Sequence, residues 1–251
     1  MKIVYHEKFR EVYSGDPAAK PGRIECILEE LKAVEGLSFV EAEDASEEDV
    51  RLVHEQGHIN YVKKLDLYEV ALLAVGGAIK AGELASRGEP SFGLIRPPGH
   101  HASSGHSWGF CYFNNVAVSV ERLRRKGLVK RVLIVDFDLH YGDGTANVFA
   151  GNPDVTYYHL PGGDRVHQLS QLSAFLSEAG DYDLVAVSAG FDRHVEDWGG
   201  VLETRDYRVI GEEIKRFAEE SCYGRRFAVL EGGYNLKVLG KNVKAFIEGF
   251  S

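Results

Sequence analysis

The stretch VLIVDFDLHYGDGT, residues 132–145, decides the fold of this chain. Its first part, VLIVD (132–136), is a short apolar, β-branched run of the kind that forms a buried strand in a parallel sheet. From Asp136 onward the segment is polar and contains glycine, which is typical of a loop that follows a strand. Because ligands bind beyond the carboxyl ends of strands in open parallel sheets, this junction predicts a site at the edge of a sheet.

Runs of the same kind recur on both sides of this stretch, and we expect each to be a buried strand. They are KIVY (2–5), LSFVEA (37–42), FGLI (92–95), VTYYHL (155–160), LVAVSAG (184–190) and FAVLEGG (227–233). Apolar positions at helical spacing lie between most of them, at 23–34, 70–86, 115–126 and 206–220. Strands that alternate with helices pair in parallel, so we predict an α/β fold with helices on both faces of the sheet.

Two local signals refine this prediction. Ser46 followed by Asp49 resembles a capping box at the start of a helix, although Asp is a loose match for the third position. Gly76 and Gly77 interrupt the helical pattern at 70–86. They indicate either a break in that helix or close packing against a neighbouring element.

The bulk composition favours one domain over residues 1–251. A chain of 251 residues with 44% hydrophobic and 27% charged residues suits one large core. It has no apolar stretch of about 18 residues, and its N-terminus has no apolar signal core, so we expect a soluble cytoplasmic protein without membrane contact. The three cysteines lie far apart, which argues against disulfides and against a thiolate zinc site.

The net charge of −9 disfavours direct binding to nucleic acid. The one basic cluster, Arg122 to Lys126 with Lys130 and Arg131, follows a helical pattern. We interpret it as a solvated helix end.

Four polar segments directly follow predicted strands: RPPGHHA (96–102), DFDLHYGDGT (136–145), SAGFD (188–192) and EGGYN (231–235). All four should open onto the same edge of a parallel sheet. A sheet core does not need polar residues clustered at one rim, so this convergence is the first evidence of a functional site.

Two carboxylates and an imidazole in these segments suggest a metal centre. Asp138 and His140 alternate with Asp136 along a strand end, so their side chains should point the same way if the extended geometry continues. Asp192, at the end of another strand, can supply a further oxygen. Three protein ligands with a vacant position are typical of catalytic zinc. Taken alone, the DxDxH pattern is equally compatible with a turn and cap.

Adjacent histidines and a tyrosine suggest chemistry beside that metal. His100 and His101 follow a Pro-Pro-Gly segment that should fix the loop sharply. Imidazoles titrate near neutral pH, so a pair beside a metal suggests proton handling, whereas a lone histidine is more often a packed residue. Asp136 and Asp143 are the carboxylates left to orient them. Tyr234, flanked by glycines, either reaches a carbonyl oxygen or is an ordinary packed aromatic residue.

These residues together resemble the histone deacetylase superfamily, which includes acetylpolyamine amidohydrolases and acetoin-utilisation proteins. RPPGHHA, GFCYFNN (109–115), VDFDLHYGDGT, SAGFD and LEGGYNL stand in family order, and VHEQGHINYV (53–62) matches a further segment. The likeness extends roughly over residues 50–240. Glu231 before the glycines is similar to the class II and prokaryotic branches.

The resemblance implies an arginase-like three-layer α/β/α fold around a mostly parallel sheet of about eight strands, one more than the runs found here. It also implies a zinc-dependent deacetylase and a structural monovalent cation near Asp136. The Asp/Asp/His donor set by itself also suits ferrous iron or cobalt. The resemblance assigns Asp138, His140 and Asp192 to the metal. It makes His100 and His101 a catalytic pair, with Asp136 and Asp143 as their carboxylates, and Tyr234 the phenol that polarises the acyl oxygen. The substrate-binding residues that it implies are Gly109, Phe110, Gly232 and Gly233.

Departures from the family pattern bear on the substrate. After Tyr61 the chain omits the longer loop in which many relatives place an acidic, substrate-gripping residue. After His159 a long glycine-rich loop is shortened, and Leu160 takes the place of the second tunnel aromatic. We therefore expect a shallow, open rim and a small or exposed acylated amine as substrate, such as an acyl-lysine or an acetylpolyamine.

In the mechanism that we expect, the metal and the histidine pair activate a water that attacks the amide carbonyl. His101 is the preferred base, His100 gives electrostatic support, and Tyr234 stabilises the oxyanion. Rival interpretations are an arginase-like hydrolase with paired manganese ions, a non-catalytic binder of acyl-amines and a scaffold for a partner complex.

Overall fold

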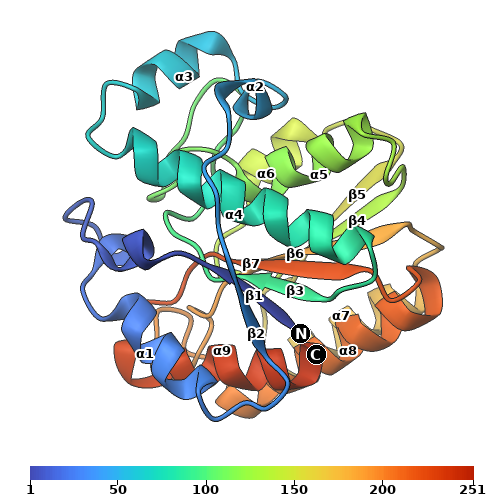
Figure 1. Cartoon of the computed structure of the whole chain (residues 1–251). Coiled ribbons are helices and arrows are strands. Elements are labelled where there is room, and N and C mark those ends of the chain that lie inside the picture. The colour runs from blue at the N-terminus through green and yellow to red at the C-terminus, as the bar shows by residue number, and fades with distance from the viewer.

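The computed structural model describes all residues 1–251 and is built on one seven-stranded parallel sheet (Figure 1). The strand order is β2-β1-β3-β7-β6-β4-β5. The strands are β1 (Lys2–Tyr5), β2 (Ser38–Glu41), β3 (Ser91–Gly93), β4 (Val132–Asp136), β5 (Val155–His159), β6 (Leu184–Ala189) and β7 (Arg226–Leu230). The predicted α/β class is confirmed. The sheet has the seven strands found in the sequence and not the eighth that the family resemblance implied.

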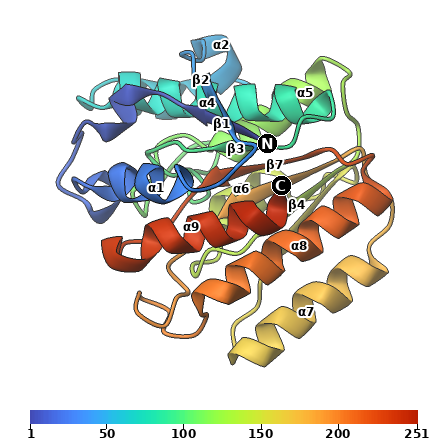
Figure 2. The same ribbon diagram turned by 60° about the horizontal axis from the view of Figure 1, so that its bottom comes forward.

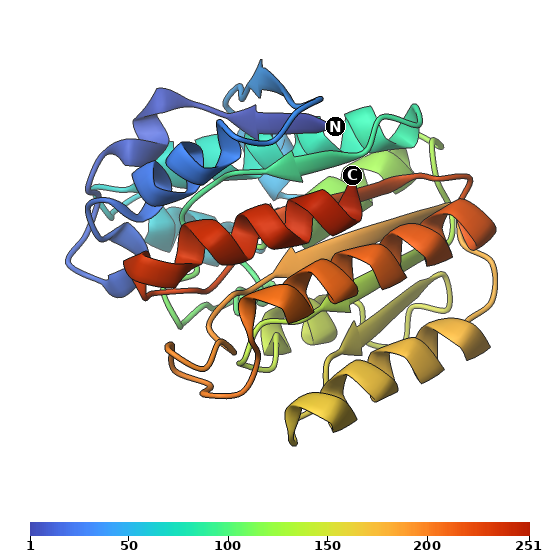
Figure 3. The same cartoon turned by 90° about the horizontal axis from the view of Figure 1, so that it is seen from below.

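Helices cover both faces of this sheet, as predicted. They are α1 (Arg23–Leu31), α2 (Glu47–Val50), α3 (Gln56–Val62), α4 (Tyr68–Ser86), α5 (Asn115–Arg125), α6 (Asp143–Val148), α7 (Arg165–Glu178), α8 (Thr204–Ser221) and α9 (Leu236–Phe250), with two short 3-10 turns at Glu7–Arg10 and Pro17–Ala19. On one face α1, α9, α8 and α7 lie side by side in that order (Figures 2 and 3). On the other face α4 packs against α5 (Figure 2).

The central strands are the most buried part of the chain. Every residue of β3, β4, β6 and β7 is buried, which explains their nearly continuous apolar sequences. The prediction that LSFVEA is a buried strand is wrong: β2 is an edge strand, and the side chain of Phe39 on it is 52% exposed. Edge position is set by the strand order, which is not visible in the local pattern.

The register of the strands aligns the starts of the predicted site segments at the carboxyl edge of the sheet. Asp136 at the end of β4 lies opposite His159 on β5 and Ser188 on β6. Ala189 on β6 in turn lies opposite Leu230 on β7. The loops that leave β4, β6 and β7 therefore begin side by side at one edge of the sheet.

Both local signals have a structural explanation. Ser46 and Asp49 form a complete capping box at the start of α2. α4 runs without a break through Gly76 and Gly77. Glycine is needed at both positions because the helix packs tightly against its neighbours there. A Cβ atom on Gly76 would lie 1.7 Å from the carbonyl oxygen of Glu43, and one on Gly77 would lie 2.6 Å from Cγ2 of Ile95.

The basic cluster lies at the end of α5, where its side chains meet acidic partners. Arg122 pairs with Asp49, Arg124 contacts Glu121, and Lys126 lies 2.6 Å from Glu83. Three of the charges in this cluster are thus paired locally, and the cluster lies at a helix end as predicted. No helix of the chain combines the length and apolar character needed to cross a membrane.

Candidate metal centre

Asp138, His140 and Asp192 come together at the carboxyl edge of the sheet. Oδ1 of Asp138 lies 3.3 Å from Nδ1 of His140, and that nitrogen lies 3.1 Å from Oδ2 of Asp192. Ligand atoms at about 2.0–2.2 Å from a tetrahedral zinc ion stand about 3.3–3.5 Å from one another. Both measured distances are close to that spacing, and the candidate ligand atoms of the three residues all lie within 4.8 Å of one another. The regular strand ends at Asp136, so Asp138 and His140 reach this position from the loop after β4.

The hydrogen bonds of the two carboxylates leave one oxygen free for a cation. The backbone N–H of His140 donates to Oδ1 of Asp138, and that of Gly232 donates to Oδ2 of Asp138. The backbone N–H of Leu139 donates to Oδ1 of Asp192. Oδ2 of Asp192 is buried and accepts no well-aligned hydrogen bond, although Nδ1 of His140 lies 3.1 Å from it. A buried, unsatisfied carboxylate oxygen is costly unless a cation compensates it. The donor set therefore fits a divalent metal.

Burial and mutual charge perturb all three groups. Burial raises the pKa of Asp192, and the adjacent charge of Asp138 raises it further. Burial also raises the pKa of Asp138, but His100 and His140 outweigh that effect, so its pKa lies below the ordinary value. Asp138 and Asp192 raise the pKa of His140 to about 10. Without a metal, a proton on His140 neutralises part of the carboxylate charge.

The tandem histidines meet the two carboxylates predicted for them. Nδ1 of His100 lies 3.0 Å from Oδ2 of Asp136, and Nδ1 of His101 lies 2.7 Å from Oδ1 of Asp143. The two imidazole rings are 4.1 Å apart between centroids. The structure brings these four predicted residues together and decides which aspartate each histidine meets, a pairing that the sequence had left open.

The two histidines have opposite electrostatic environments. Burial lowers the pKa of His100, but Asp138 and Asp136 raise it more, and the net pKa is well above the ordinary value. Burial lowers the pKa of His101 to about 4, and the neighbouring His100 adds to this shift. At neutral pH His100 is therefore charged, whereas His101 is neutral and able to accept a proton.

Tyr234 is held between aromatic rings beside the triad. Its ring stacks on Trp198 at 4.0 Å between centroids and meets Phe110 edge-on at 6.0 Å. Asp197 accepts hydrogen bonds from the backbone N–H groups of Tyr234 and Asn235, which fixes the loop after β7. Burial raises the pKa of Tyr234, and Asp138 and Asp192 raise it further, so its phenol stays protonated at neutral pH.

The four predicted substrate-binding residues lie in two places. Gly109 and Phe110 both have positive φ, at 59° and 66°, and a Cβ atom on Gly109 would lie 2.5 Å from the His101 ring. A Cβ atom on Gly232 would lie 2.5 Å from Oδ2 of Asp138, so glycine is needed for the end of β7 to approach the triad. Gly233 has a φ of 113° and faces Leu239 and Phe191 of the core. Their contact with substrate stays a prediction.

The sequence interpretation missed two aromatic residues that hold the carboxylates. Nε1 of Trp108 donates to Asp143 at 2.9 Å, and the Trp108 ring lies 3.9 Å from that of His101. The Tyr157 hydroxyl donates to Oδ2 of Asp136 at 2.9 Å and accepts from the backbone of Gly142. Trp108 stands directly before the GFCYFNN motif, which was a usable signal. Tyr157 lies within a strand and gave none.

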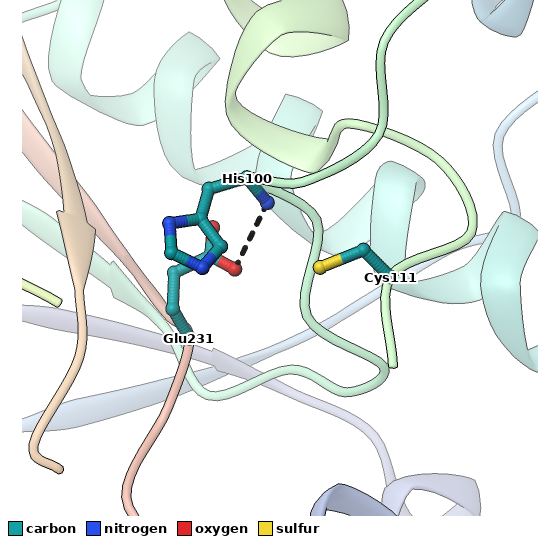
Figure 4. A group of neighbouring side chains, drawn as sticks. All are labelled: His100, Cys111 and Glu231. Carbon is teal, nitrogen blue, oxygen red and sulfur yellow. Dashed lines mark hydrogen bonds between the residues drawn. The ribbon is translucent and has the colours of Figure 1, made fainter. Parts of the chain in front are cut away.

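A second buried group surrounds His100. Glu231 rises from the end of β7 and accepts hydrogen bonds from the backbone N–H groups of Gly99 and His100, at 2.7 and 3.2 Å, while the sulfur of Cys111 faces them from a neighbouring loop (Figure 4). Burial raises the pKa of Glu231 to about 7. With two backbone donors on one oxygen, Glu231 fastens the loop that carries the histidine pair.

The prediction that Leu160 lines the rim of the site is wrong. Leu160 is fully buried in the core, so it cannot take the place of a tunnel aromatic. A surface cavity of about 560 Å³ lies beside Tyr234 and Trp198. Its other lining residues come from the segment 12–21 near the N-terminus. The sequence interpretation had not connected that segment with the site.

Comparison with known proteins shows the family and the fold of this chain. Residues 65–163 and 166–250 match the family model of the histone deacetylase domain. A probable deacetylase of Methanothermobacter thermautotrophicus is 31% identical to this chain, over 91% of this chain and 84% of that protein. The polyamine deacetylase HDAC10 of Mus musculus is 28% identical, over 98% of this chain and 47% of its own length. The crystal structure of the HDA15 HD domain matches with a TM-score of 0.83 at 24% identity, covering 98% of this chain and 87% of that one, and this likeness shows the fold.

Metal binding should release a proton at neutral pH. His140 has a pKa of about 10 in the metal-free protein, and its nitrogen must lose that proton to become a ligand. The apparent metal affinity should therefore rise about tenfold per pH unit between roughly pH 7 and 9. Calorimetric titration with zinc in buffers of different ionisation enthalpy measures the release. A pH-independent affinity with no proton release would show that His140 is not a ligand.

Tyr157→Phe should lower kcat/KM about tenfold, because Asp136 loses the donor that orients it toward His100. Tyr158→Phe is the matched control, since the Tyr158 hydroxyl is buried without a hydrogen-bond partner and its ring merely stacks on Phe175. Steady-state kinetics on both purified variants give the comparison. Equal activity of the two variants would remove Tyr157 from the functional site.

Proposed function

Because this chain belongs to the histone deacetylase family, and is therefore a deacetylase, we propose that it uses zinc to remove an acetyl or other short acyl group from a small or exposed acylated amine. The observation that carries this proposal is the group formed by Asp138, His140 and Asp192, in which one buried carboxylate oxygen accepts no well-aligned hydrogen bond. Two carboxylates and an imidazole are a zinc set with a position open to substrate. Ferrous iron and cobalt suit the same donors.

Zinc held by these ligands would polarise the acyl oxygen and acidify the attacking water. His101 is the base that takes the proton of that water. Its Nδ1 is engaged by Asp143, so the other ring nitrogen, Nε2, accepts the proton and afterwards delivers it to the leaving amine. The low pKa of His101, about 4, keeps it ready for this role at neutral pH.

His100 and Tyr234 support the charge that develops on the acyl oxygen. His100 is charged and lies against Asp136, so it contributes a fixed positive charge beside the reacting atoms. Tyr234 keeps its proton, and its phenol is the donor that we assign to the acyl oxygen. Phe110 and Trp198 hold the phenol ring on two sides, which limits its movement.

The exposure of the rim supports a small or accessible substrate. The side chain of His140 is 36% exposed, so the metal ligand nearest the solvent lies at shallow depth. Trp108, Trp198 and Tyr141 are each more than half exposed. An acyl-lysine in a flexible segment and an acetylated polyamine both fit such a rim, and one relative is named a polyamine deacetylase.

Residues 1–251 are proposed to form one catalytic domain, since the sheet joins strands from both ends of the chain. A paired-manganese hydrolase is less well supported. The second group of candidate ligands contains the thiol of Cys111 and one carboxylate, whereas manganese prefers oxygen ligands.

The test is a panel of an acetyl-lysine peptide, an acetylated polyamine and a small acetamide, assayed on protein of known metal content. Hydrolysis should disappear with a chelator and return on addition of zinc. The two small substrates and the peptide should be cleaved more readily than the same acetyl-lysine inside a folded protein. Zinc-loaded protein that binds these compounds without hydrolysing any of them would instead be a non-catalytic binder.

Tyr234→Phe should lower kcat at least about tenfold while leaving zinc content unchanged, because one oxyanion donor is typically worth several kcal/mol. Tyr141→Phe is the control, since Tyr141 is 55% exposed at the rim and its hydroxyl makes no hydrogen bond within the chain. Turnover and metal content are measured on the same preparations. Unchanged turnover in Tyr234→Phe would exclude the phenol from the reaction.

A further inference from the structure

Arg193, directly after Asp192, is a buried arginine whose side chain has no carboxylate partner. Its exposed fraction is 2%, and the hydrogen bonds of its guanidinium all go to neutral acceptors. All of its N–H groups are nevertheless satisfied. The acceptors are the carbonyl oxygens of Phe137, Asp138 and Pro161 at 3.1 Å, that of Leu160, Oε1 of Gln168 at 3.0 Å and Nε2 of His159 at 3.2 Å.

A buried guanidinium that contacts only neutral groups needs compensation, because burial of an unpaired charge is costly. The carboxylates of the metal centre offset part of this cost. Asp138, Asp192 and Asp136 stabilise the charged form of Arg193 through space, although burial is the larger effect and lowers its pKa. The charge of Arg193 thus balances part of the negative charge behind the triad.

Four backbone carbonyl oxygens from two loops converge on this one group. Phe137 and Asp138 lie after β4, and Leu160 and Pro161 lie after β5. Clusters of backbone carbonyls are also the ligands that replace the hydration shell of a bound potassium ion. The backbone N–H of Leu160 donates to the carbonyl of Asp136 at 2.8 Å, so the cluster adjoins the place where the family resemblance implied a monovalent cation.

We propose that the Arg193 guanidinium is a built-in cation that occupies this carbonyl cluster and takes the place of a bound monovalent ion. It is a positioning residue: it holds the carbonyl of Asp138 from a backbone position next to Asp192, and so links the loops that carry both carboxylate ligands. The wild-type protein accordingly needs no potassium. Removal of the Arg193 side chain opens a carbonyl-lined site that potassium can fill.

The experiment compares wild type and Arg193→Ala as full-length, metal-free protein in potassium chloride and in choline chloride at equal ionic strength. The melting temperature of the wild type should be the same in both salts. The variant should be less stable in choline chloride and should gain about 3 °C or more at a potassium concentration ten times its Kd. These readouts need neither zinc nor substrate, so they remain valid if the proposed deacetylase activity fails.

A cobalt titration followed by absorption gives a second readout, which rests on the proposed metal site. Cobalt affinity of Arg193→Ala should fall at least about tenfold in choline chloride and recover in potassium chloride, since a displaced supporting group typically costs about 10–100-fold in affinity. Wild-type affinity should not depend on the salt.

Arg226→Ala is the matched control. Arg226 is also buried and donates to two carbonyl oxygens, but it lies at the start of β7, away from the metal loops. It should lose stability without any specific response to potassium. If Arg193→Ala does not fold, Arg193→Lys keeps the positive charge and should fold, bind cobalt and remain independent of potassium.

Three results would overturn the proposal. One is a saturable response of the wild type to millimolar potassium. Another is a folded Arg193→Ala that responds to potassium no more than Arg226→Ala does. The last is an Arg193→Lys protein that depends on potassium for stability.

Discussion

Three buried carboxylates at the ends of adjacent parallel strands are the constraint on which this structure depends. Asp136, Asp138 and Asp192 are each almost inaccessible to solvent. Their charges repel one another in a medium of low polarity, so every neighbouring element must compensate them. Backbone N–H groups contribute to this, as do His100, Arg193 and the metal that we propose. The glycine at position 232 is required because backbone approaches one of these carboxylates closely enough to donate to it.

The same constraint separates the roles of two adjacent histidines. His100 lies against the fully buried Asp136 and close to Asp138, and these two charges keep it protonated. His101 faces Asp143, whose side chain is 33% exposed and shared with Trp108, and it is repelled by the charge of His100. Two identical side chains at consecutive positions therefore differ in protonation because their loop turns them toward different carboxylates.

The rim is formed by parts of the chain that have no common sequence pattern. Trp198 comes from the loop after β6, Trp108 from the loop after β3, and the wall beside Tyr234 from residues 12–21. Aromatic side chains with one face exposed can pack against an alkyl chain while leaving its end in water. Such a rim places few steric limits on what carries the acyl group.

The sequence alone predicted the seven strands, the helical segments at 23–34, 70–86, 115–126 and 206–220, the meeting of four polar segments at one edge, and the candidate ligands, histidines and aspartates within those segments. These follow from residue pattern and from the rule that parallel strands end at a common edge, both of which are local properties. Tertiary structure alone decided that β2 is an exposed edge strand, which aspartate each histidine meets, and that Leu160 is buried in the core. It also decided that Tyr157 and Arg193 support the metal loops. Those features depend on strand order and on contacts between residues far apart in the chain, which no local pattern encodes.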